Sequence, residues 1–158
     1  MKLKRMLFLS LGAVLALSLT ACGSYNTSAA DNNKSGAVQL VSPFRPCDTL
    51  DAAEEMAGFE LTLPQNADRL EAIENEMIQA FYGEDGMDML IRKASGSEDI
   101  SGDFNTYEQI EAVDGVTLKG ADGRFSLALW TDGEYTYSIS VGNALSQADM
   151  MALVSGVE

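Results

Sequence analysis

Histidine is absent from the sequence. It is the commonest general base and metal ligand in proteins, so its absence removes every Ser-His or Cys-His nucleophile arrangement. Cysteine is scarce too, with only Cys22 and Cys47. If Cys22 is modified, Cys47 has no partner in the chain and no intramolecular disulfide can form. We expect Cys47 to be buried beside the start of a helix, because free cysteines prefer the interior, and the alternative is a disulfide with a partner.

Basic residues are also few. The chain has 10 Lys and Arg against 24 Asp and Glu, giving a formal net charge of −14 at pH 7. A domain this acidic is repelled by nucleic acid and by anionic membrane surfaces. We therefore predict that nucleic acid is not a partner.

Long apolar runs are missing except near the N-terminus. Met6 to Leu19 is apolar but too short to span a bilayer comfortably, and Lys2, Lys4 and Arg5 precede it. A positive segment followed by a short apolar one is typical of a secretory signal peptide. Its removal would take away three bases and no acid, and would shift the net charge from −14 to −17.

The apolar run ends in Leu19-Thr20-Ala21-Cys22, which resembles the processing site of a bacterial lipoprotein. The resemblance implies cleavage before Cys22 and attachment of acyl chains, palmitate among them, to the new N-terminus. Two acyl chains give the stable anchoring that one chain does not. The implied location is the outer face of the cytoplasmic membrane of a Gram-positive bacterium. The alternative is an ordinary cleaved signal followed by a chance cysteine.

Composition divides the chain into three parts. Residues 1–21 are the expected signal peptide, residues 22–42 are small and polar and predict a flexible tether, and residues 43–158 form one domain. Ser42-Pro43 and Arg45-Pro46 mark the boundary between tether and domain.

Three Asp-Gly pairs separate alternating apolar and polar residues between Asn105 and Val141. They stand at positions 114–115, 122–123 and 132–133. Asp-Gly is a strong hairpin signal because glycine accepts the positive φ of a tight turn. The pattern predicts four consecutive antiparallel strands.

The lengths of these loops follow from the requirement that apolar residues share one face of the sheet. Loops of three, two and three residues, in chain order, meet that requirement. They place Phe125, Leu127 and Leu129 on the apolar face. Trp130 is then expected on the opposite, polar face, beside residues such as Thr136.

Local signals predict the remaining elements. Asp48 or Thr49 begins a helix that ends near Ala57, and Ser146 begins a final helix. Residues 59–63 and 89–94 are predicted strands. Residues 68–82 are ambiguous, because their apolar spacing and composition favour a helix, whereas a turn at positions 75–76 would make them a hairpin.

The order of five segments is familiar: "GFELTLP", "MIQAFYG", "IRKASGSEDISGDFNTYEQ", "VTLKG" and "LALWTDGEYTYSISV". It resembles the Gram-positive extracytoplasmic domain-of-unknown-function family 4367, over about residues 43–157. The resemblance implies an extracytoplasmic α+β domain on a meandering sheet and favours the hairpin for residues 68–82. It carries no established activity. We therefore predict an α+β fold, with an antiparallel meandering sheet of six or seven strands and a short helix at each end of the domain packed on one face.

The acidic loop at residues 95–103 contains Glu98, Asp99 and Asp103 and could bind a divalent cation such as calcium. The EF-hand spacing is absent, and Arg92 and Lys93 stand just before the acids. We favour a solvated or salt-bridged loop, and no metal or cofactor is predicted.

Trp130 is the remaining candidate for a functional residue. An aromatic side chain on a polar sheet face can contact a partner or a saccharide, although an additional strand or helix could also cover it. The methionines, including residues 87, 89, 150 and 151, are interpreted as core filling rather than as soft-metal ligands.

The function predicted from the sequence is that of a lipid-anchored extracytoplasmic binding or sensing module without catalytic residues. Its expected partners are the membrane, through the lipid on Cys22, and an envelope protein or cell-wall ligand. Two alternatives stay open: an inhibitory or assembly partner of another envelope protein, and a hydrolase that depends on a divalent cation.

Overall fold

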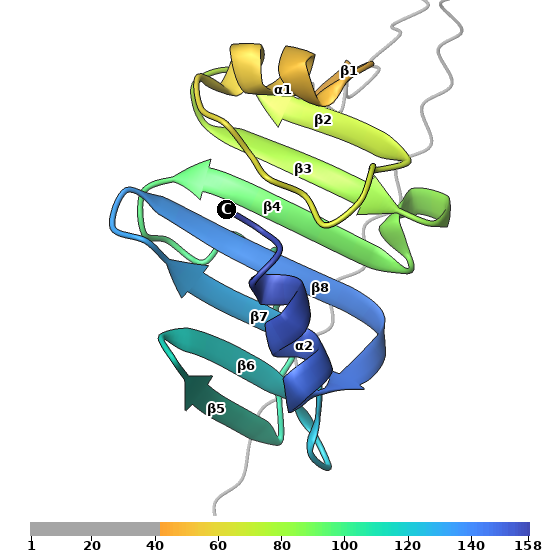
Figure 1. Cartoon of the computed structure of the whole chain (residues 1–158), viewed down its shortest axis with the longest axis vertical. Coiled ribbons are helices and arrows are strands. Elements are labelled where there is room, and N and C mark those ends of the chain that lie inside the picture. The colour runs from red at the N-terminus through yellow and green to blue at the C-terminus, as the bar shows by residue number, and fades with distance from the viewer. Residues whose placement is uncertain (1–41) are drawn as a thin grey trace, which may run out of the picture. The chain divides into compact units, whose positions relative to one another are not determined.

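One antiparallel sheet of eight strands dominates the computed structural model, which describes residues 42–158 (Figure 1). The predicted signal peptide, Cys22 and nearly all of the predicted tether lie outside the described residues. The strands are β1 (Arg45–Cys47), β2 (Arg69–Ile73), β3 (Met77–Tyr82), β4 (Met89–Ser95), β5 (Gln109–Val113), β6 (Val116–Ala121), β7 (Arg124–Thr131) and β8 (Tyr135–Ser146). The helices are α1 (Leu50–Ala57) and α2 (Gln147–Val154), and η1 (Glu84–Gly86) is a short 3-10 turn.

The sheet consists of two four-stranded meanders. Its strand order is β1-β2-β3-β4-β8-β7-β6-β5, so the halves β1–β4 and β5–β8 meet where β4 pairs with β8. Residues 96–108 carry the chain from β4 to β5 at the far edge of the sheet (Figure 1). We call this segment the crossing loop.

The two faces of the sheet differ. The core face carries Ile78, Ile91 and Ile139, and the loop face carries Arg92 and Thr136. Alternation along each strand separates the two sets. The antiparallel sheet with two short helices confirms the coarse prediction, although the described residues hold eight strands rather than six or seven.

The ambiguous segment at residues 68–82 is the hairpin of β2 and β3. Ile73 pairs with Met77 and Leu70 with Ala80 across the turn. Asn75 has a positive φ of 56° in that turn, a conformation that asparagine adopts more readily than most residues. Strand alternation buries Leu70, Ala72, Ile78 and Ala80 on one face of the hairpin.

The Asp-Gly loops differ from the predicted lengths at two of three places. Val113 pairs with Val116, so the first loop has two residues where three were expected. The second loop has two, as predicted. Both are type I′ turns in which the aspartate and the glycine have positive φ.

The third loop is longer than predicted. Thr131 pairs with Thr136, so four residues connect β7 to β8 instead of three. Register shifts then bring Phe125 opposite Leu145. The bulge in β7 keeps Phe125 on the core face. Leu127 pairs with Ser140 and Leu129 with Ser138, so both lie on the loop face, and their expected position on the apolar face is wrong.

The predicted strand at residues 59–63 is wrong. This segment forms no ladder with a neighbouring strand. The Leu61 amide donates to Glu54 Oε1 at 2.8 Å, and the Thr62 amide donates to the Glu158 carbonyl oxygen at 2.8 Å. We call residues 59–63 the strap, because their hydrogen bonds link α1 to the C-terminal end. Leu61, in the middle of the strap, is buried.

Both helices begin where their caps predict. Thr49 caps α1, and Gly58 ends it with a φ of 81°. Ser146 caps α2 by accepting from the Asp149 amide. Ala53 of α1 is buried against β2 and β3, and α2 packs on β7 and β8. The α1 helix is not the first element, because β1 precedes it.

Four side chains complete the comparison with the sequence. Cys47 lies on β1 and is only half-buried, as a free thiol. Met89 and Met150 are buried in the core as predicted. Met87 is 72% exposed, so core filling does not explain that methionine.

Candidate functional site

The Trp130 indole lies on the core face and stacks on the Tyr137 ring. The ring centroids are 5.1 Å apart and the planes differ by 4°. Trp130 pairs with Tyr137 across the strands, whereas Leu129 pairs with Ser138. The expected position of Trp130 on the polar face, beside Thr136, is therefore wrong, because the longer third loop reverses the register. Trp130 remains partly exposed at the margin of the core.

Lys93 lies in an aromatic cage next to this stack. Its side chain is on the core face, is only 7% exposed, and donates from Nζ to the Glu60 carbonyl oxygen at 2.8 Å. The rings of Tyr135, Tyr137 and Phe59 surround Nζ at 4.8, 5.0 and 5.7 Å. Cation–π attraction of this kind compensates part of the cost of burying the charge.

The charge on Lys93 has no direct ion-pair partner within residues 42–158. Burial lowers the pKa of the Lys93 ammonium, and more distant carboxylates such as Asp132 and Glu54 oppose that effect. The cage thus holds a buried cation mainly with ring faces and one carbonyl oxygen.

Asp132 closes the same cluster at the β7–β8 loop. The Tyr137 hydroxyl donates to Asp132 Oδ2 at 2.6 Å, and the Tyr135 amide donates to Oδ1 at 3.0 Å. The bond from Tyr137 holds the pKa of Asp132 below its usual value. The pKa of Tyr137 is raised, first by burial and then by this bond. Asp132 is therefore engaged in stabilising its own turn.

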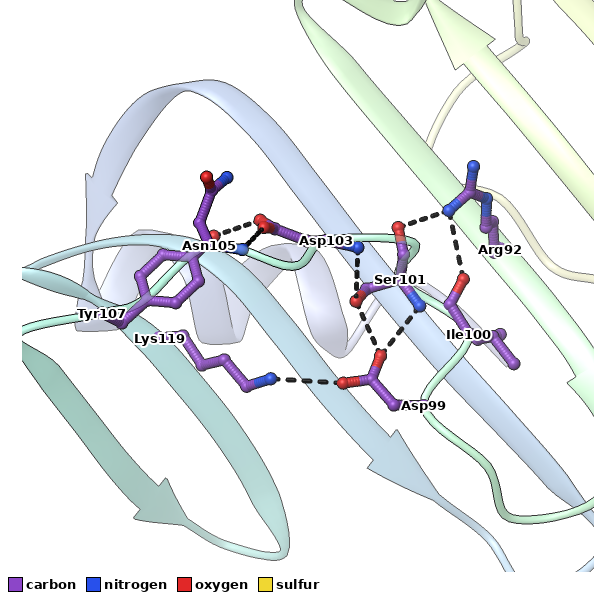
Figure 2. A network of polar contacts seen from close by, with 8 residues as sticks. All are labelled: Arg92, Asp99, Ile100, Ser101, Asp103, Asn105, Tyr107 and Lys119. Atoms are coloured by element: carbon purple, nitrogen blue, oxygen red, sulfur yellow. Dashed lines mark hydrogen bonds and ion pairs between the residues drawn. The ribbon is translucent and has the colours of Figure 1, made fainter. Parts of the chain in front are cut away.

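Arg92 anchors the crossing loop to the loop face (Figure 2). Its Nη1 donates to the carbonyl oxygen of Ile100 at 3.1 Å and also to that of Ser101. Its Nε donates to Gln79 Oε1 at 3.1 Å. Burial lowers the pKa of the guanidinium. These bonds pair Arg92 with main-chain carbonyl groups, and Thr136 adds a bond from its hydroxyl to the Gly96 carbonyl oxygen at 2.7 Å.

Asp99 is held by three hydrogen bonds within the crossing loop and from β6. Its Oδ1 accepts from the Ser101 amide at 2.9 Å and from the Ser101 hydroxyl at 2.6 Å, and its Oδ2 pairs with Lys119 Nζ at 3.2 Å (Figure 2). Burial works to raise the pKa of Asp99, but the bonds from Ser101 and Lys119 outweigh it and lower the pKa.

Asp103 is held in a similar way a few residues later. It accepts from the Asn105 amide at 2.8 Å and from the Tyr107 hydroxyl (Figure 2). The bond from Tyr107 is the main reason why the pKa of Asp103 lies below its usual value. The Asp103 amide in turn donates to Ser101 Oγ at 3.2 Å. Both carboxylates thus organise the backbone of the crossing loop.

The cations that pair with these acids are not the expected ones. Arg92 bonds to carbonyl oxygens, and Lys93 points to the opposite face of the sheet. Lys119, from β6, supplies the ion pair to Asp99 instead. In the part of the chain that the structure describes, no three acidic or cysteine side chains are grouped as metal ligands would be.

A cleft of about 240 Å³ lies between the crossing loop and strands β6 to β8. Its lining is rich in hydroxyl groups and consists of Ser97, Glu98, Asp99, Gly115, Thr117, Leu129, Trp130, Thr131 and Thr136. Because its ring stacks on the core face, Trp130 borders this cleft with its main chain. The Trp130 ring and the acidic loop therefore lie on opposite faces of the sheet.

A second cavity, of about 740 Å³, lies beside the start of α1. It is lined by Asp48, Thr49, Leu50, Leu61, Thr62, Leu63, Pro64, Gln65, Asn66, Ala67 and Leu70. Its only charged lining residue is Asp48, so it offers no pair of ionisable groups for acid–base chemistry.

Sequence reasoning missed the buried lysine, although a signal for it exists. Met89, Ile91 and Lys93 alternate along β4, so the strand places Lys93 in the core row. The aromatic cage could not be found in this way, because Phe59 and Tyr135 come from distant parts of the chain.

Within residues 42–158, no helix has the length and apolar character needed to cross a membrane. No family model, curated protein or solved structure matches the chain. The resemblance to family 4367 therefore stays a prediction.

Proposed function

We propose that the protein is an extracytoplasmic binding or sensing module without catalytic residues, held at the outer face of the cytoplasmic membrane by a lipid on Cys22. Its partner is an envelope protein or a cell-wall ligand, and Trp130 is the contact residue. The observation that carries this proposal is the Trp130–Tyr137 stack. A partly exposed indole fixed by stacking contributes contact area at little further cost in conformational entropy.

Two further features support a binding role over a catalytic one. Asp99, Asp103 and Asp132 each use their carboxylate oxygens to accept hydrogen bonds that hold loops. The sequence also lacks histidine as a general base. The strongly negative charge favours a protein or cell-wall partner over nucleic acid.

The proposal includes the finer arrangement of the fold. The helices α1 and α2 stand near the two ends of the domain and cover the core face with their apolar sides. Burial of Ala53, Ala57 and Met150 in one hydrophobic cluster supports this arrangement.

In-cell crosslinking of the full-length chain, followed by identification of the captured molecules, tests the proposed contact. We expect Trp130→Ala to reduce the yield of the captured partner. Phe104→Ala is the matched control, because Phe104 is 98% exposed and lies in the crossing loop on the other face. An unchanged yield with Trp130→Ala, or an equal loss with Phe104→Ala, contradicts the proposed role of Trp130.

The membrane anchor has a separate test. Cys22→Ser should abolish labelling by radioactive palmitate and move the protein out of the membrane fraction. Cys47→Ser is the control and should leave both unchanged. If Cys22→Ser remains labelled and membrane-bound, the proposed anchor is wrong.

A further inference from the structure

The two edges of the sheet are protected to different degrees. The β1 edge has only three residues, contains Pro46, and continues almost directly into α1. Short strands and prolines prevent pairing with other chains. The β5 edge at the other end has neither device, and its five residues contain no proline and no lysine (Figure 1).

The register of β5 shows which backbone groups are open. Val113 and Val116 flank a two-residue turn and therefore form a hydrogen-bonded pair. Hydrogen-bonded pairs recur at every second residue of an antiparallel strand, so the backbone groups of Glu111 and Gln109 also bond to β6. The amide and carbonyl groups of Ile110 and Ala112 then point away from β6, and no backbone group among residues 42–158 pairs with them.

The side chains along this edge define the chemistry of a partner. Ile110 is 63% exposed and Ala112 is exposed as well. Glu108 and Asp114 flank them on the same side of the strand, and Glu111 lies between them on the other side. The edge is therefore acidic at its ends and apolar in its middle.

The nearest basic residue does not neutralise the negative charge of this edge. Lys119 lies opposite Ile110 on β6, but it is already paired with Asp99. Charge complementarity therefore calls for a basic partner with small aliphatic residues in its centre.

A second copy of this chain fits the edge poorly. Antiparallel self-pairing over the whole of β5 would centre on Glu111, and it would place Glu111 against its own copy and Glu108 against Asp114. Like charges directly opposite each other across strands are destabilising.

We propose that the open edge of β5 docks an extended basic segment of another protein, which adds to the sheet as a further strand antiparallel to β5. Main-chain hydrogen bonds to Ile110 and Ala112 supply the affinity, and the acids around them select a basic segment. This inference goes beyond the proposed function, because it names the chemistry of a partner and does not involve Trp130.

A palindromic peptide, Lys-Thr-Val-Lys-Val-Thr-Lys, is a suitable probe. In the antiparallel register its residues lie in turn opposite Asp114, Val113, Ala112, Glu111, Ile110, Gln109 and Glu108. The amides of its two valines then point to β5, and those of its two threonines point away. Binding to the full-length chain in detergent micelles can be measured by the fluorescence anisotropy of the labelled peptide.

Backbone methylation separates strand addition from attraction between charges, because it removes an amide donor and leaves the charge unchanged. We expect methylation of both valine amides to weaken binding by about tenfold or more. Methylation of both threonine amides should leave the affinity near that of the parent peptide. Equal binding by the two methylated peptides means adsorption by charge alone and overturns the proposal, as does the absence of binding by the parent peptide.

Two variants of the protein test the same edge. Ile110→Lys should weaken peptide binding by about tenfold or more, because an edge lysine opposes a basic strand. Met87→Lys makes the same charge change at another exposed apolar position and should have a much smaller effect. Equal losses in both variants overturn the proposal.

The oligomeric state provides the final discrimination. We expect the full-length chain to sediment as a monomer in the micelle. A dimer that Ile110→Lys dissociates would make a second copy the occupant of the edge and would overturn the proposed basic partner.

Discussion

Lys93 and Glu60 are joined by a hydrogen bond of 2.8 Å from the ammonium nitrogen to a main-chain carbonyl oxygen. The bond connects β4 to the strap, and the rings of Phe59 and Tyr135 lie within 5.7 and 4.8 Å of Nζ. A buried charge thus adds to the bonds from Leu61 and Thr62 that hold a segment outside the sheet ladder. The stability of the strap should depend on this contact.

Replacement of Lys93 tests how much of that stability comes from its charge. Lys93→Ala should lower the free energy of unfolding by about 2–4 kcal/mol, because it leaves a cavity and an unpaired carbonyl group. Lys93→Met also loses the bond to the Glu60 carbonyl oxygen, but it keeps most of the packing and removes the cost of burying a charge, so it should lower the free energy by only about 1–2 kcal/mol. Urea unfolding measures both. A loss as large for methionine as for alanine would show that the charge itself stabilises the fold.

Acid should unfold the protein partly through Asp132. Its pKa in the folded state lies below the usual value of 3.8, so the unfolded chain takes up the proton first as the pH falls. The stabilisation is complete above the usual pKa and is lost as the pH falls through the lowered one. Tyr137→Phe removes the main hydrogen-bond donor to Asp132. The free energy of unfolding should then fall less steeply as the pH is lowered through this range.

Urea unfolding between pH 7 and pH 2.5 gives the two profiles. Asp99 and Asp103 act in the same direction in both proteins, so the difference between the profiles isolates Asp132. Profiles of equal slope would mean that Tyr137 does not control the pKa of Asp132.

Alkali should act through Tyr82. Burial, with a contribution from Asp68, raises the pKa of Tyr82 from 10.0 to about 12. The unfolded chain therefore loses the phenolic proton first, and the stabilisation is lost as the pH rises from about 10 through 12. Tyr82→Phe should remove this loss, at the cost of the bond to the Gln65 carbonyl oxygen. Absorbance of tyrosinate follows the ionisation, and an ordinary pKa for Tyr82 would contradict the prediction.

Arg92 should matter more for the crossing loop than the ion pair between Asp99 and Lys119. Arg92→Ala removes the donor to two carbonyl groups and should cost about 2–4 kcal/mol of the free energy of unfolding. Lys119→Met breaks a partly exposed ion pair and should cost less than about 1 kcal/mol. Amide hydrogen exchange in residues 99–103 should accelerate strongly in Arg92→Ala and weakly in Lys119→Met. Similar exchange rates in the two variants would assign Arg92 no special role.

Local signals in the sequence predicted the elements that local chemistry determines. Thr49 and Ser146 begin helices because their hydroxyl groups accept from the helix amides. The Asp-Gly pairs at residues 114–115 and 122–123 terminate strands because both positions accept positive φ. Three strands of the sheet and both helices could be predicted on that basis.

Features that depend on distant contacts could not be predicted in the same way. The strap is extended like a strand, but its partners are Glu54 and Glu158. The face of Trp130 depends on the length of one loop and on bulges in β7 and β8, and an error of one residue reverses it. The partner of Asp99 is Lys119, which only the path of the crossing loop brings near.

The pairing of β4 with β8 has a consequence for how the chain folds. Ser95 pairs with Tyr135 and Met89 with Val141, whereas every other strand pairing except β1–β2 joins neighbours through a short turn. Each meander can therefore assemble largely from local contacts, but joining them requires the closure of a long loop before any contact is gained. The slow step of folding is expected to be the meeting of two half-sheets, and until then each half presents β4 or β8 as an unprotected edge.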